Sequence, residues 1–280
     1  MGTIVLYCLL YAGGIVFLAG CIVRAVRYSR QPLHLRWELY PVPHGRSGEL
    51  KIMLPEILFL KGLWEFNRSM WYVSFPFHFG LYLLAAGGML LAGAAAAPLA
   101  WFPAMHAAYA FCGTAGALLA LAGALGLLAR RIAVRELRQY SSPGDYLNLL
   151  FFAAALVLLL AGEWSRSAGS PGPLAILRGA ATFDGALKLP ALLSAGMAVG
   201  AVLLAYIPMT HMAHFIAKYF TYHQVRWDER ANVAGGSIQK HMAEYLMYRP
   251  TWRAPHIAAG AGDRTWVDIA TSNPTKGGAR

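Results

Sequence analysis

Four histidines in or beside apolar stretches are the residues best suited to chemistry in this sequence. They are His78, His106, His211 and His214. An ionisable side chain inside a membrane is energetically unfavourable and is retained mainly for function, and imidazole is a common axial ligand of haem iron. The stretch 206–223 holds two of these histidines and then Lys218. It therefore predicts a b-type haem held in a small helical membrane bundle.

The composition favours a membrane protein. Of the 280 residues, 58% are hydrophobic and 13% are charged, with a mean hydropathy of +0.46, whereas roughly a quarter of the residues in a soluble domain are charged. The net charge of +11 is crowded between long apolar runs, which argues against nucleic-acid binding. Three isolated cysteines, Cys8, Cys21 and Cys112, form no C-x-x-C motif, so neither a zinc site nor an iron–sulfur cluster is expected in this chain.

Five apolar runs are close to or above the ~20 residues that cross ~30 Å of hydrocarbon. They cover about 3–23, 71–95, 104–129, 146–164 and 190–217. Isolated apolar runs of this length can span lipid only as helices. The predicted fold class is therefore an all-α integral membrane protein. A five-helix, haem-binding membrane domain over 1–217 is followed by a cytoplasmic tail over 218–280.

The distribution of positive charge predicts the orientation. All but three of the 24 lysine and arginine residues lie on one side of these spans, and the three exceptions are Arg166, Arg178 and Lys188. The positive-inside rule then puts the N-terminus outside and the C-terminus inside.

Two cytoplasmic segments are more than simple loops. The connector 24–70 is expected to contain an amphipathic helix over 55–70 that lies at the membrane interface, with Ile57, Leu60 and Trp64 on one face. The tail has mixed charge, many Gly and Pro residues, and several aromatic residues. These aromatic residues are Trp227, Tyr245, Tyr248, Trp252 and Trp266. They favour an arm that docks on a partner over a free tail.

Three of the histidines lie in the inner half of the membrane. His78 is about 15 Å inward of Arg68, while His211 and His214 are roughly 10 and 6 Å from Lys218. A single intramembrane histidine can instead make an interhelical hydrogen bond, but histidines matched in depth on two antiparallel spans favour haem. Depth alone slightly prefers His211 as the partner of His78.

Two further residues bear on this prediction. Gly80 would leave room for a porphyrin face beside His78. His106 lies at the outer start of the third span, where it could bind a second haem, hydrogen-bond a quinone, or reach the interface.

Several short motifs together resemble one family over nearly the whole chain. They are Trp37 to His44, Phe75 to Gly80, Arg130-Arg131 with Leu137-Arg138-x-Tyr140, Pro208-x-Thr210-x-x-x-His214, and Lys218 to Thr221. The pattern resembles the gamma subunit of respiratory nitrate reductase. It is closer still to the related membrane subunits that serve heterodisulfide reductase-like iron–sulfur proteins, including the sulfite-reductase-associated complex.

The resemblance implies a cytochrome b subunit of a quinol-dependent oxidoreductase complex rather than a stand-alone enzyme. Such a subunit exchanges electrons between menaquinol or another quinone and a cytoplasmic iron–sulfur subunit, in a bacterial or archaeal cytoplasmic membrane. The inner haem ligands of the pattern match His78 and His214, in place of His211. The positions of the outer pair of haem ligands in the pattern correspond to Gly88 and Gly196. One haem b is therefore expected, or a second one ligated differently, with His106 the first candidate and His211 an alternative ligand.

Other residues complete these expectations. Arg68, Arg130 and Arg131 could neutralise haem propionates on the inner side, or could serve only as positive-inside anchors. On the outer side, a quinone cleft could be lined by His106, Glu163 and Trp101. The alternatives are a haem-free structural anchor for a peripheral redox enzyme and a transporter. A transporter would need polar mid-membrane groups or an inverted repeat, and the sequence shows no repeat.

Overall fold

The computed structural model describes residues 2–30, 43, 45–96, 102–227, 233–251 and 264–272, and every regular element within these ranges is helical. The chain divides into two units. The first unit comprises 1–23 and 44–213, and the second comprises 24–43 and 214–280. Each unit is described by itself.

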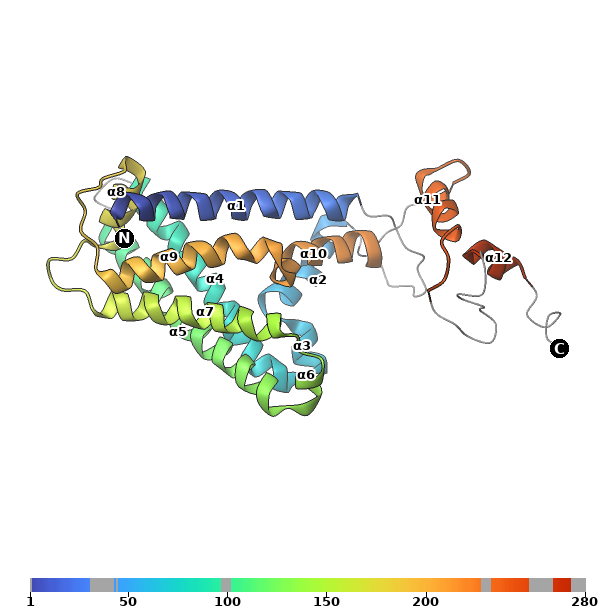
Figure 1. Cartoon of the computed structure of the whole chain (residues 1–280), viewed down its shortest axis with the longest axis horizontal. Coiled ribbons are helices and arrows are strands. Elements are labelled where there is room, and N and C mark those ends of the chain that lie inside the picture. Colours follow the sequence, from blue (N-terminus) through green and yellow to red (C-terminus); the bar gives the residue numbers. More distant parts are fainter. Residues whose placement is uncertain are drawn as a thin grey trace. The chain divides into compact units, whose positions relative to one another are not determined.

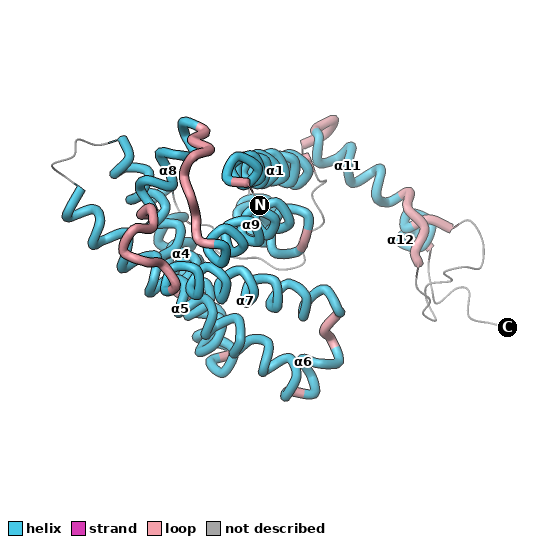
Figure 2. The backbone as a smooth tube through the Cα atoms, turned by 60° about the vertical axis from the view of Figure 1, so that its left-hand side comes forward, coloured by secondary structure: helices cyan, strands magenta, loops and turns pink. Residues whose placement is uncertain are grey.

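Five of the helices are long and apolar enough to cross a membrane. They are α1 (Thr3–Ser29), α4 (Arg68–Ala96), α5 (Phe102–Ala133), α7 (Pro143–Trp164) and α9 (Ala191–Tyr206). The predicted all-α fold with five spans is thus confirmed for the described residues, and the protein is a multi-pass membrane protein. In the first unit α4 packs along α5, α5 against α7, and α7 against α9 (Figures 1 and 2).

Glycines set the distance between α4 and α5. A Cβ added at Gly80 would lie 2.6 Å from the carbonyl oxygen of Gly116, and one at Gly123 would lie 2.6 Å from Cα of Phe77. Without side chains at these positions the two backbones touch, as small residues allow in membrane helices. Gly80 therefore serves helix packing against α5, and the expectation that it leaves room for a porphyrin face is wrong.

Glycines also bring α9 against α7. A Cβ added at Gly196 would lie 2.7 Å from the backbone nitrogen of Leu159, and one at Gly162 would lie 2.5 Å from Cα of Leu193. Position 196, where the sequence resemblance would place an outer haem ligand, is thus buried in a helix interface with no room for a side chain.

The predicted interfacial helix over 55–70 is not continuous. The segment forms α2 (Gly45–Leu58) and α3 (Lys61–Phe66), which are separated by a left-handed Leu60 with φ of 52°. A left-handed conformation costs a non-glycine residue roughly 1–2 kcal/mol. Hydrogen bonds from α4 to this turn, described below, offset that cost. They are tertiary contacts, and local sequence preference does not reveal them.

The fifth span is interrupted near its end. Residues Ile207–Met209 and His211–Ala213 form two 3₁₀ turns separated by an extended Thr210, and α10 (His214–Phe220) follows. Pro208 has no N–H to donate, which explains why the α-helix stops there. The prediction of a regular helix through 217 is wrong in this part, so His211 and His214 do not lie on one α-helix.

The remaining helices are short. They are α6 (Arg135–Gln139), α8 (Pro173–Thr182), α11 (Ser237–Leu246) and α12 (Trp266–Thr271), with a π-helical turn over Thr221–Arg226. Trp227, which was expected to face a partner, is buried against Tyr222 with ring centroids 4.7 Å apart. Trp252 lies outside the described residues, as does the Trp37 to His44 motif apart from Pro43.

Replacing Gly80 by Leu should separate α4 from α5. We expect a loss of about 1–3 kcal/mol in the free energy of unfolding, the usual effect of overpacking, measured as a lower Tm in detergent. Gly200→Leu is the matched control, because a Cβ at Gly200 has nothing within 4 Å. Equal Tm losses in the two variants would contradict the close α4–α5 packing.

Candidate functional site

The ring orientation of His78 suits metal ligation. Its Nδ1 lies 2.8 Å from the carbonyl oxygen of Ser74, one turn earlier in α4. A carbonyl can only accept a hydrogen bond, so Nδ1 carries the proton and, in the neutral ring, Nε2 holds the lone pair. Histidines that ligate metals are commonly held by such a hydrogen bond to the other ring nitrogen. The structure therefore presents His78 in the tautomer that an axial haem ligand needs.

His78 shares one face of α4 with three aromatic residues. Trp71, Phe75, His78 and Tyr82 follow the i, i+4, i+7, i+11 spacing of a helix face. The indole Nε1 of Trp71 donates to the carbonyl of Phe59 at 2.7 Å, and the hydroxyl of Tyr82 donates to the carbonyl of Ile57 at 2.8 Å. The turn between α2 and α3 therefore touches this face on both sides of His78.

His214, the predicted second ligand, is the first residue of α10 and its side chain is exposed. It belongs to the second unit, whereas His78 belongs to the first. Their pairing across a haem stays a prediction.

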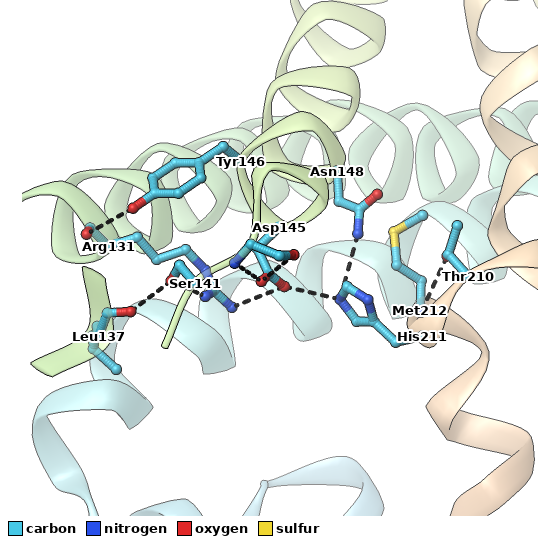
Figure 3. Close-up of polar contacts among 10 residues, drawn as sticks. Arg131, Leu137, Ser141, Asp145, Tyr146, Asn148, Thr210, His211 and Met212 are labelled. Carbon is cyan, nitrogen blue, oxygen red and sulfur yellow. Dashed lines mark hydrogen bonds and ion pairs between the residues drawn. The ribbon is translucent and has the colours of Figure 1, made fainter. Parts of the chain in front are cut away.

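His211 lies in a polar cluster at one end of α7 (Figure 3). Its Nε2 is 3.3 Å from Oδ1 of Asp145 and 3.4 Å from the side-chain nitrogen of Asn148. Asp145 is largely buried, and Arg131 lies 3.8 Å from the same carboxylate. His211 thus makes the interhelical contact expected of a membrane histidine that does not bind a metal.

The polar cluster also begins α7. The carboxylate of Asp145 accepts hydrogen bonds from the backbone N–H of Ser142 at 2.8 Å and from its hydroxyl at 2.9 Å. Such a capping box fixes the first turn of a helix. One carboxylate therefore stabilises the start of α7 and holds Arg131 and His211 beside it.

The three expected propionate partners are placed differently. Arg130 donates to the hydroxyl of Ser69 at 3.2 Å, which brings it to the first turn of α4. Arg68 lies in the same turn, with its guanidinium 4.7 Å from the ring centroid of Trp64. Arg131 instead donates to Ser141 at 2.7 Å and faces Asp145. Arg68 and Arg130 are thus close to the start of the helix that carries His78, while Arg131 belongs to the polar cluster.

A cavity of about 1060 Å³ lies at the opposite ends of these helices. It joins α4, α5, α7, α8 and α9, all within the first unit. Its wall includes Leu84, Gly88, Leu91, His106, Tyr109, Gly113, Leu160, Glu163, Arg166, Leu174 and Arg178. Two of the three residues predicted to line a quinone site, His106 and Glu163, are therefore in one cavity. The third, Trp101, lies outside the described residues.

The polar groups of the cavity are concentrated on a few residues. Glu163 and Arg166 form an ion pair, and Arg166 also donates to the carbonyl of Pro171 at 2.8 Å. The ring of His106 meets that of Tyr109 edge-on, with centroids 5.0 Å apart. Gly88, by contrast, faces open space, because nothing lies within 4 Å of a Cβ added there.

The sequence did not point to α8 as one wall of this cavity. The segment 165–189 has the appearance of a simple connector, although Pro173 at a helix start and the apolar Leu174 and Ile176 were available signals. Helix α1 holds α8 and the segment after it in place. The hydroxyl of Tyr11 donates to the carbonyl of Ala180 at 3.2 Å, and that of Thr3 donates to the carbonyl of Leu187 at 2.8 Å.

Comparison with known proteins assigns this chain to no family. No protein-family model matches the chain, and no curated protein matches it. The fold and the cavity define a multi-pass, all-α membrane protein.

Replacing Asp145 by Ala should destabilise the first turn of α7. Loss of the helix cap and of the contacts with Arg131 and His211 should lower the free energy of unfolding by about 1–2 kcal/mol. Thermal unfolding of the purified protein measures the change. The exposed Glu136 of α6 provides the control, since Glu136→Ala should stay within about 0.5 kcal/mol. If the two variants unfold at the same temperature, Asp145 has no such role.

Proposed function

We propose that this protein is a membrane cytochrome b subunit that passes electrons between the quinone pool and a cytoplasmic iron–sulfur subunit. The observation that carries the proposal is the cavity that holds His106, Glu163 and Arg166 among apolar side chains. In this proposal the N-terminus is outside and the C-terminus inside, following the positive-inside rule. The cavity then lies in the outer half of a bacterial or archaeal cytoplasmic membrane.

A quinone is the ligand that suits this cavity. Sites for small cofactors are apolar clefts of roughly 300–1,000 Å³ with a few convergent polar groups, and this one has about 1060 Å³. Leucines 84, 91 and 160 provide an apolar surface for a ring and its hydrocarbon tail. Oxidation of a quinol releases two electrons and two protons, and His106, Glu163 and Asp184 are groups of the cavity wall that can accept protons.

His78 and His214 would hold a haem b near the inner side. The tautomer of His78 fits this role, because the Nδ1–H group donates to the carbonyl of Ser74 and the lone pair that would bind iron is on Nε2. Arg68 and Arg130, at the first turn of α4, would neutralise the propionates. The haem, when bound, supplies one-electron transfer, while the protein tunes it through its ligands and neighbouring charges.

The tail would provide the contact with the iron–sulfur subunit. In α11 the side chains of Ile238, Met242 and Tyr245 follow one face and are only partly buried. Aromatic and methionine side chains are enriched at interfaces. A subunit of heterodisulfide reductase-like type is the partner that the sequence resemblance suggests.

Loss of either proposed ligand should remove the haem. We expect His78→Ala and His214→Ala each to abolish the reduced b-type absorbance of purified protein, whereas His211→Ala keeps it because His211 contacts Asp145 instead. Pyridine haemochrome assays per polypeptide measure the haem content. An empty site in His211→Ala alone would refute the assignment of His214. Absence of haem from the wild-type protein in its own membranes would favour a haem-free anchor.

Filling the cavity should block quinol oxidation without unfolding the protein. Gly88 lines the cavity and has free space beside it, so Gly88→Phe should reduce the rate of haem reduction by menaquinol roughly tenfold or more. Reduction by dithionite should be unchanged. Gly14→Phe is the control, because Gly14 also has nothing within 4 Å but lies away from the cavity. Unaltered quinol kinetics in Gly88→Phe would exclude the cavity as the quinone site.

A further inference from the structure

Helix α2 has a polarity that changes along its length rather than around it. Its first half carries Arg46, Glu49 and Lys51, while the residues that follow, from Ile52 to Leu60, include Glu56 as their single charge. A helix that lies flat at an interface has a polar face and an apolar face along its whole length. A helix that enters the membrane by one end has a polar end and an apolar end, as α2 does.

The apolar half of α2 is exposed on the protein. Leu54 and Leu58 are 46% and 40% exposed, and Leu50, one turn before Leu54, is 54% exposed. Phe59 at the turn and Phe66 at the end of α3 are 56% and 88% exposed. An exposed apolar surface with this many large side chains must be shielded from water.

Contacts with α4 show how deep the turn lies. Trp71 is about 4–5 Å and Tyr82 about 21 Å along the helix axis from Arg68, where α4 begins. Their side chains nevertheless reach carbonyls only two residues apart, those of Phe59 and Ile57. The turn therefore lies between these two levels, roughly 10 Å along α4 from Arg68. With Arg68 taken as the membrane boundary, this position is within a half-membrane of ~15 Å.

Several backbone groups at the turn are paired within the protein. The carbonyls of Ile57 and Phe59 accept from Tyr82 and Trp71. The N–H of Phe59 donates to the carbonyl of Pro55, and that of Gly62 donates to the carboxylate of Glu56 at 2.9 Å. Non-helical backbone is tolerated at membrane depth only when its polar groups are satisfied in this way. Glu56, the one charged side chain between Ile52 and Leu60, is itself used to satisfy an N–H group. Lys61, the first residue of α3, pairs with Glu65 at 3.5 Å.

We infer that the second half of α2 and its turn into α3 form a re-entrant hairpin inserted in the hydrocarbon of the bilayer. Lipid acyl chains cover Leu54, Leu58 and Phe59, and the tip rests on the face of α4 that carries His78. This membrane insertion rests on neither haem nor quinone binding.

Spin labels at three positions test the insertion. The native cysteines are replaced by Ala, and Leu50→Cys, Leu54→Cys and Leu58→Cys are labelled one at a time in the full-length protein in lipid vesicles. These residues are four apart along nearly one face, so an inserted helix gives labels that deepen by up to about 6 Å per step. Accessibility to oxygen should rise, and accessibility to a nickel chelate should fall, from 50 to 58.

A flat interfacial helix would give the three labels similar depths, and a water-exposed one would leave position 58 open to the nickel chelate. Either result would overturn the proposal. Low accessibility to both reagents at 58 would also overturn it, because protein rather than lipid would then cover the site.

The anchoring by α4 is tested in the same assay. Trp71→Phe combined with Tyr82→Phe removes both hydrogen bonds to the turn and should make position 58 more accessible to the nickel chelate. Tyr72→Phe, at an exposed residue of the same helix, should leave it unchanged. Equal accessibility in the double variant and the wild type would show that these bonds do not hold the tip.

Discussion

The structure depends on one constraint, which is that lipid offers no hydrogen bonds to a polar backbone. Inside a helix, away from its first and last turns, each N–H and C=O is satisfied within the helix. At the turn after α2 the chain is not helical, and side chains from α4 together with Glu56 take the place of water. At the end of the fifth span, where Pro208 stops the helix, Thr210 accepts from the N–H of Met212 at 3.2 Å. Irregular backbone is found where the protein can pair it.

The same constraint explains which parts of the fold were predictable. Hydropathy was sufficient for the five spans, because a membrane helix is specified by an apolar run and little else. The break at Leu60 could not be foreseen, since no Gly or Pro marks it and its compensation comes from residues in another helix. Pro208 was a visible signal for the second break, although the 3₁₀ turns after it depend on local packing. Gly80 stood out beside His78 in the sequence, but its packing against α5 did not.

The candidate site was predictable in its residue types and less so in its arrangement. Histidines within apolar runs stand out from the sequence alone, and so does the grouping of arginines at one side. The contact between His211 and Asp145 joins residues far apart in the chain, so it required the structure. The same holds for the cavity, because α8 closes it from a segment that resembles an ordinary connector. His106 and Glu163 were proposed to act together, and the structure places both in its wall.

The packing of α9 on α7 has a consequence for how this protein can evolve. At Gly196 the backbone of one helix rests on that of the other, so no single substitution can introduce a side chain there without separating the two. Gly88 lies beside open space, so a side chain fits there without moving a helix. Any ancestor or descendant with histidine at position 196 must therefore have a different spacing between α7 and α9. Substitution of Gly196 thus requires a change in helix packing, whereas substitution of Gly88 does not.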